Sequence, residues 1–145
     1  MNYLLIDTSS RIAQAALASD EKIIASYSWG AENLSKNLLK KIDGLFKKAK
    51  ISPKDLNGLI VYLGPGSYTG LRIGIAIINS FAYSLNILIA GIKGPKPGRK
   101  KLEIQKLEPI DLNVLLEKGL KAFKSGEGKM IVLPFYGKEP NIGKS

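Results

Sequence analysis

The chain has 145 residues and a formal net charge of +10, and it contains neither cysteine nor histidine. Without these residue types it has no disulfide framework, no thiolate nucleophile, no His-based triad, and none of the usual zinc or non-haem iron sites. Any chemistry would depend on carboxylates, hydroxyls, backbone dipoles and oxygen-bound metals such as magnesium. The sequence shows neither a membrane-length apolar run nor a signal peptide, so we expect a cytoplasmic protein of one domain, with or without an appendage.

Short apolar runs alternate with turns in the first part of the chain. Residues 2–7, 12–18 and 22–28 are predicted to be strands, and their short connections make them antiparallel neighbours. Residues 33–50 follow as an amphipathic helix, with apolar side chains on one side and lysines on the other. The segment 52–55 has a serine cap followed by proline, which predicts a short helical turn.

A glycine-rich stretch at residues 64–74 separates an apolar strand at 58–63 from a helix at 70–85. Thr69 is expected as the helix N-cap, with Ser67 as the less favoured choice. Two interpretations stay open: the loop N–H groups face a phosphate or an acidic group of a partner, or the glycines only permit a tight reversal and close packing. The stretch has neither the lysine of a P-loop nor the spacing of a dinucleotide fingerprint.

The helix at 70–85 carries apolar side chains around most of its circumference, so it must be buried on more than one side. Few elements in a chain this short could cover it. We therefore expect part of this helix, with the helix at 33–50 beside it, to pack against another protein chain, because exposure to water would leave a large apolar patch.

The remaining elements complete an α/β fold. A strand at 87–92 gives a five-stranded mixed sheet, in which three antiparallel strands precede a strand-helix alternation, with helices on at least one face. Residues 94–108 are a basic Pro/Gly linker that ends in a short strand at 102–108. A helix capped by Asp111 and stopped at Ser125 follows, and then a last strand at 130–133.

The lysines and arginines form two clusters that could meet nucleic acid. One is on the 33–50 helix and comprises Lys36, Lys40, Lys41, Lys47, Lys48 and Lys50, which we interpret first as a solvated helix face. The other lies in residues 93–106. It is either a mobile loop that meets RNA or an acidic protein, or a solubilising linker. Its candidate RNA contacts are Lys96, Arg99, Lys100 and Lys101.

Three motifs resemble the TsaB family, also called YeaZ: Leu5-Ile6-Asp7-Thr8-Ser9, the stretch from Gly64 to Ala76, and Leu133-Pro134-Phe135-Tyr136 with Glu139-Pro140. The resemblance covers residues 1–93 nearly without interruption and continues more weakly at 109–142. It implies an actin/Hsp70/sugar-kinase-like (RNase H-like) domain at 1–93. The linker at 94–108 would then lead to a truncated C-terminal part at 109–145, which is a reduced second lobe.

The resemblance also implies a function. Family members are non-catalytic scaffold subunits in the synthesis of threonylcarbamoyl-adenosine at position 37 of tRNA, and they bind the catalytic subunit TsaD through two helices, here 33–50 and 70–86. A TsaE-like ATPase and tRNA would join through the complex, the chain alone would form a homodimer, and no cofactor is expected. The contact residues expected on this basis are Leu34, Leu38, Ile42, Leu71, Arg72, Ile75, Ile78 and Ala82. Leu34 lies where many family members have a histidine.

Two other functions stay open. A minimal nucleotide-binding enzyme would use Asp7, Thr8, Ser9, Gly64, Gly66 and Ser67. Asp7 would then hold magnesium or act as an acid or base, but in a member without catalysis we favour a structural role, in which the carboxylate accepts N–H bonds from the turn that follows it. No glycine follows Asp7 to let phosphate approach the backbone. The other function is a small RNA-binding module that acts through residues 93–106.

Overall fold

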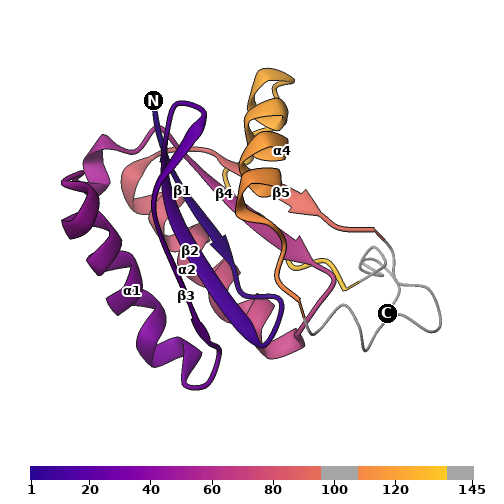
Figure 1. Ribbon diagram of the computed structural model, residues 1–145. Helices are drawn as coiled ribbons and strands as arrows, with labels where there is room; N and C mark the ends of the chain where they lie inside the picture. Colours follow the sequence, from indigo (N-terminus) through magenta and orange to yellow (C-terminus); the bar gives the residue numbers. More distant parts are fainter. Residues whose placement is uncertain (96–107, 137–145) are drawn as a thin grey trace.

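The computed structural model describes residues 1–95 and 108–136, which form a mixed sheet with helices on both faces (Figure 1). The elements are, in chain order, β1 (Asn2–Asp7), β2 (Ile12–Ser19), β3 (Lys22–Gly30), α1 (Leu34–Ala49), the short 3-10 helix η1 (Pro53–Asp55), β4 (Gly58–Gly64), α2 (Tyr68–Leu85), β5 (Ile89–Lys93) and α4 (Leu112–Lys124). The predicted order of strands and helices up to residue 93 is therefore confirmed. Among the helices described, none is long and apolar enough to cross a membrane.

The sheet has the strand order β3-β2-β1-β4-β5. β1 pairs antiparallel with β2, and β2 with β3, because the two connections are tight turns. β1 and β4 pair in parallel, as do β4 and β5, since each of these connections passes through a helix. The predicted five-stranded mixed sheet of the RNase H-like class is thus confirmed.

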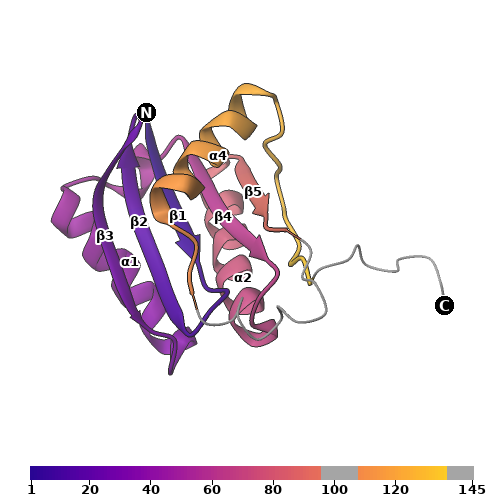
Figure 2. The same ribbon diagram turned by 45° about the vertical axis from the view of Figure 1, so that its right-hand side comes forward.

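Each face of the sheet has its own core. Side chains alternate along a strand, so Leu4 and Ile6 of β1 face one side and Tyr3 and Leu5 the other. The first side is covered by α1 and α2 and the second by α4, which Figure 2 shows in front of the sheet. The C-terminal helix therefore packs on the same sheet. The division of the chain at 93 and 108 stays a prediction.

The caps of two helices were predicted with different success. The side chain of Ser67 accepts a hydrogen bond from the backbone N–H of Gly70 at 3.1 Å, so α2 begins at Tyr68 and Ser67 is its N-cap. The favoured choice of Thr69 was wrong, because Thr69 already lies in the first helical turn. Asp111 caps α4 as predicted and accepts from the N–H of Asn113 at 2.8 Å.

The strand predicted at 130–133 does not form. Lys129 makes an isolated antiparallel bridge with Ile89 of β5, and the backbone then leaves the strand edge. The Asn79 side chain of α2 instead holds Val132, donating to its carbonyl and accepting from its N–H, both at 3.0 Å. The apolar composition of the run therefore does not reflect a strand in the sheet: Val132 is buried, while Ile131 and Leu133 are exposed. Residues 102–107 of the other predicted C-terminal strand lie outside the described residues.

Candidate functional site

The glycine-rich loop packs directly on the turn that follows β1. The N–H of Ser67 donates to the carbonyl of Ser9 at 2.7 Å, and the Thr8 hydroxyl donates to the carbonyl of Gly70, also at 2.7 Å. A Cβ at Gly66 would collide with the Ser9 carbonyl oxygen, and one at Gly70 with that of Thr8. These contacts support the second interpretation of the stretch, in which glycines permit close approach of two backbone segments.

Asp7 is fully buried between the sheet and the start of the C-terminal helix. One carboxylate oxygen accepts from the N–H of Ser9 at 2.9 Å and from its hydroxyl at 2.6 Å. The other accepts from the N–H of Ile110 at 3.1 Å and from the Gln14 amide at 3.4 Å. Burial raises the pKa of Asp7, and the hydrogen bonds from Ser9, Ile110 and Gln14 partly offset this rise.

The six weak cofactor candidates are therefore engaged with their own chain. Asp7, Thr8, Ser9 and Ser67 bond to each other's segments, and Gly66 lies against Ser9. Gly64 lies against the carbonyl of Phe135. Within residues 1–95 and 108–136, no three acidic side chains come together in a way that could hold a metal ion. These residues hold β1, the glycine loop and the C-terminal segment in close contact.

An aromatic cluster lies at the start of α2, on its exposed side. The rings of Tyr68 and Tyr136 stack with their centroids 5.0 Å apart, and the Arg72 guanidinium lies 5.2 Å from the Tyr68 ring. Arg72 also donates to the Tyr68 hydroxyl at 3.3 Å. Neither tyrosine was predicted as a site residue, although each lies inside a motif that carried the family resemblance.

Three of the lysines of α1 make contacts within the domain. Lys41 and Lys48 lie 5.6 Å and 5.4 Å from the centre of the Tyr27 ring on β3, so they cover that edge of the sheet. Lys47 pairs with Asp43 one turn earlier at 2.9 Å, in an exposed position. This arrangement agrees with a solvated helix face. The four candidate RNA contacts, Lys96, Arg99, Lys100 and Lys101, lie outside the described residues.

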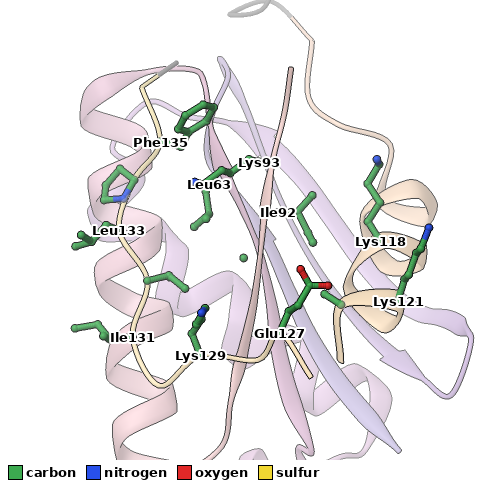
Figure 3. A pocket seen from close by; sticks show the side chains of 14 residues that line it. Leu63, Ile92, Lys93, Lys118, Lys121, Glu127, Lys129, Ile131, Leu133 and Phe135 are labelled. Carbon is green, nitrogen blue, oxygen red and sulfur yellow. The ribbon is translucent and has the colours of Figure 1, made fainter. Parts of the chain in front are cut away.

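A groove of about 710 Å³ runs along the outer side of β5 (Figure 3). The helix α4 contributes Lys118 and Lys121 on one side, and the segment 129–135 contributes Ile131 and Leu133 on the other. This groove could not be predicted from the sequence, because the segments that line it are far apart in the chain.

Comparison with known proteins matches residues 16–94, more than half of the chain, to the family model described as "TsaD: tRNA N6-adenosine threonylcarbamoyltransferase". The chain is 36% identical over 93 residues to the tRNA threonylcarbamoyladenosine biosynthesis protein TsaB of Bacillus subtilis, which covers 63% of this chain and 41% of the relative. It is 43% identical over 93 residues to the TsaB of Buchnera aphidicola, covering 61% and 42%. The chain belongs to the family of this model, and the relatives that it resembles are named TsaB.

The similarity to known proteins has two limits. The chain spans about two fifths of the length of these curated relatives. A solved structure titled as an uncharacterized protein with similarity to peptidase YEAZ from Pseudomonas aeruginosa superimposes with a TM-score of 0.77, covering 94% of this chain and 99% of that one. Its identity is 15%, so the likeness shows the fold alone.

The TsaB resemblance named eight contact residues, and the structure places seven of them beneath the helices. Leu34, Leu38, Ile42, Leu71, Ile75, Ile78 and Ala82 are all buried in the core that α1 and α2 form with the sheet. Only Arg72 is exposed. The seven predicted residues thus lie on the face of the helices that packs on the sheet, and a partner could contact only the opposite face.

Asp7 gives a pH-dependent prediction for the stability of this domain. Asp7→Asn should lower the free energy of unfolding by about 1–3 kcal/mol, because an amide donor then faces the N–H of either Ile110 or Ser9. The raised pKa means that folded Asp7 holds its proton more tightly than unfolded Asp7. The protonated side chain therefore adds to the stability of the fold fully below pH 3.8, the ordinary pKa, and this added stability is lost as pH rises through the folded pKa. Urea unfolding at several pH values from 3 to 8 measures both effects.

The matched control is Asp43→Asn, which alters an exposed carboxylate on α1. We expect that control to change stability little and to keep the pH dependence of the wild type. An Asp7→Asn protein with unchanged stability and an unchanged pH profile would show that the buried network does not tie β1 to Ile110.

Proposed function

We propose that this chain is a non-catalytic scaffold subunit in the synthesis of threonylcarbamoyl-adenosine at position 37 of tRNA, and that it binds a TsaD-like transferase through α1 and α2. The curated relatives are named as biosynthesis proteins for this modification. The single observation that carries the proposal is the exposed face of α2, which is nearly free of charge.

That face differs from an ordinary solvated helix surface. α2 has 18 residues, of which Arg72 alone is charged. Its exposed positions include Ala76, Ser80 and Tyr83, and the Tyr83 side chain is 88% exposed. Small residues permit a neighbouring helix to approach closely, and exposed aromatic rings and arginines are typical anchors of protein interfaces. A partner that covers this face would bury Tyr83 and the Tyr68-Arg72 cluster.

The neighbouring helix extends the surface. α1 lies beside α2 on the same face of the sheet and exposes Leu39, whose side chain is 54% exposed among lysines. The lysines would give a basic margin to an apolar centre, which favours a partner with acidic residues around its contact helices. In isolation, we propose that the same surface joins two copies of the chain.

The scaffold role is supported by what the chain's own residues do. Asp7 and the glycine loop are engaged in packing within the domain, and the chain contains no histidine that could hold a catalytic metal. We propose that a TsaE-like ATPase and tRNA associate through the complex and not with this chain alone.

Co-expression with a TsaD-like protein tests the proposal. We expect the two chains to co-purify at equal stoichiometry in size-exclusion chromatography with light-scattering mass determination. We also expect threonylcarbamoyl-adenosine to form in a reconstituted reaction only when both are present. Formation of the modified nucleoside at the full rate without this chain, or no association between the two proteins, would contradict the scaffold function.

A further inference from the structure

The groove beside β5 contains the outer edge of the sheet. Ile89 exchanges two backbone hydrogen bonds with Lys129, one of 2.7 Å from the Ile89 N–H and one of 2.8 Å from the Lys129 N–H. Ile89 therefore directs its backbone groups away from β4. Residues two apart along a strand in a ladder face the same neighbour, so the N–H and the carbonyl of Gly91 face this outer edge too.

Within residues 1–95 and 108–136, no backbone pairs with the outer edge of β5 beyond Ile89. The backbone leaves β5 after Lys129, Asn79 of α2 holds Val132, and the N–H of Phe135 bonds to the Leu63 carbonyl on β4 at 2.8 Å. In the part of the chain that the structure describes, nothing pairs with the outward N–H or carbonyl of Gly91. The groove thus offers an open continuation of the pairing that Lys129 begins.

The groove is basic at its rim and apolar inside. Lys118 and Lys121 of α4 and Lys129 line it with Lys93, against one acidic residue, Glu127. Ile92 supplies apolar surface on β5, and Ile131 and Leu133 belong to the segment on the side opposite the α4 lysines (Figure 3), where the Ile131 side chain is 66% exposed. A ligand that fits must combine acidic groups with apolar side chains.

We propose that this groove binds an extended acidic peptide segment of another protein, which adds to the sheet as a sixth strand along the edge of β5. Backbone pairing at Gly91 gives the segment its register, and alternate side chains contact the apolar surface and the lysines. The chain's own undescribed segments, 96–107 and 137–145, contain more basic than acidic residues and do not complement the groove. The site is separate from the outer face of α1 and α2, so its failure would leave the scaffold function untouched.

A peptide fits this groove better than RNA does. A strand edge pairs with a peptide backbone, which carries alternating donors and acceptors, whereas a phosphate backbone has no N–H to give. Single-stranded RNA binds by stacking bases on aromatic rings. Among the described residues that line the groove, Phe135 is the only aromatic one, and it is buried, with the Lys93 amine 5.0 Å from its ring centre.

The experiment uses the full chain and a fluorescein-labelled peptide of five Glu-Val repeats, with binding followed by fluorescence anisotropy. We expect saturable binding that weakens as salt is raised, and a change in the amide NMR signal of Gly91. The double variant Lys118→Glu/Lys121→Glu should bind about tenfold more weakly, because two attractive charges become repulsive. The matched control, Lys36→Glu/Lys40→Glu on α1, should bind as the wild type does.

A fully N-methylated version of the peptide separates strand addition from simple charge attraction. It keeps every side chain and loses every backbone donor, so we expect it not to bind. Equal binding of the two peptides, equal binding by the α4 double variant, or no binding of the unmodified peptide would each overturn the proposal. Tighter binding of a ten-nucleotide oligouridylate than of the peptide would assign the groove to RNA instead.

Discussion

Replacing Ala76 with aspartate should abolish association with the proposed TsaD-like partner while leaving the fold intact. Ala76 is exposed near the middle of α2, between Arg72 and Ser80 along the outer face of the helix. A carboxylate there would be buried without a partner in any contact that covers this face, and such a burial costs several kcal/mol. We expect the dissociation constant to rise at least about 100-fold, measured by calorimetry with the purified partner.

The control for this variant is Val114→Asp. Val114 is an apolar side chain on α4 that is 39% exposed, and α4 covers the opposite face of the sheet. We expect Val114→Asp to bind as the wild type does and Ala76→Asp to melt within a few degrees of it. Wild-type affinity in the Ala76→Asp variant would move the contact away from the outer face of α2.

The same test cannot be made with the inner residues of α2. Ile75 and Ile78 are buried against the sheet, so an aspartate at either position would place a charge in the chain's own core. Loss of binding by those variants would then report unfolding and say nothing of the partner surface.

Replacing Gly70 with alanine should destabilise the domain by about 1–3 kcal/mol, the reverse of what this change does in an ordinary helix. Alanine normally favours a helix over glycine by about 1 kcal/mol. Here the added Cβ meets the backbone carbonyl of Thr8, which cannot move without disturbing β1, and the Thr8 hydroxyl bond to the Gly70 carbonyl would be strained as well. Urea denaturation followed by circular dichroism gives the free energy of unfolding.

Gly30→Ala is the matched control, because a Cβ at Gly30 meets nothing within 4 Å and its φ is not positive. We expect that variant to stay within about 0.5 kcal/mol of the wild type. A stabilised Gly70→Ala protein would mean that the loop and the turn after β1 are not in close contact in solution.

Most of the fold could be predicted because its elements have clear periodicities. The strands β1 and β4 are continuous apolar runs, as strands buried on both faces are, and most of the apolar side chains of α1 recur on one side of the helix. The exposed face of α2, which we propose as the partner surface, could not be predicted in the same way. Apolar residues surround that helix, so its sequence does not distinguish the side that packs on the sheet from the side that stays exposed.

The candidate site was harder to predict because its contacts join distant parts of the sequence. Asp7 was expected to accept N–H bonds from the turn after it, and Ser9 does donate to it. The bond from Ile110 could not be foreseen, because this residue is 103 positions away in the chain. The run at 130–133 has the composition of a strand, yet the side chain of Asn79 holds its backbone on α2.

The position of α4 sets the shortest fragment that can be produced on its own. The recognisable family match ends at residue 94, but Leu115 and Leu116 of α4 cover Tyr3, Leu5, Ile60 and Ala90 on the second face of the sheet. A fragment that ends at residue 94 would have one apolar face of the sheet exposed to solvent, which favours aggregation. Workable expression boundaries therefore have to include the residues up to Phe135, whose backbone is bonded to β4.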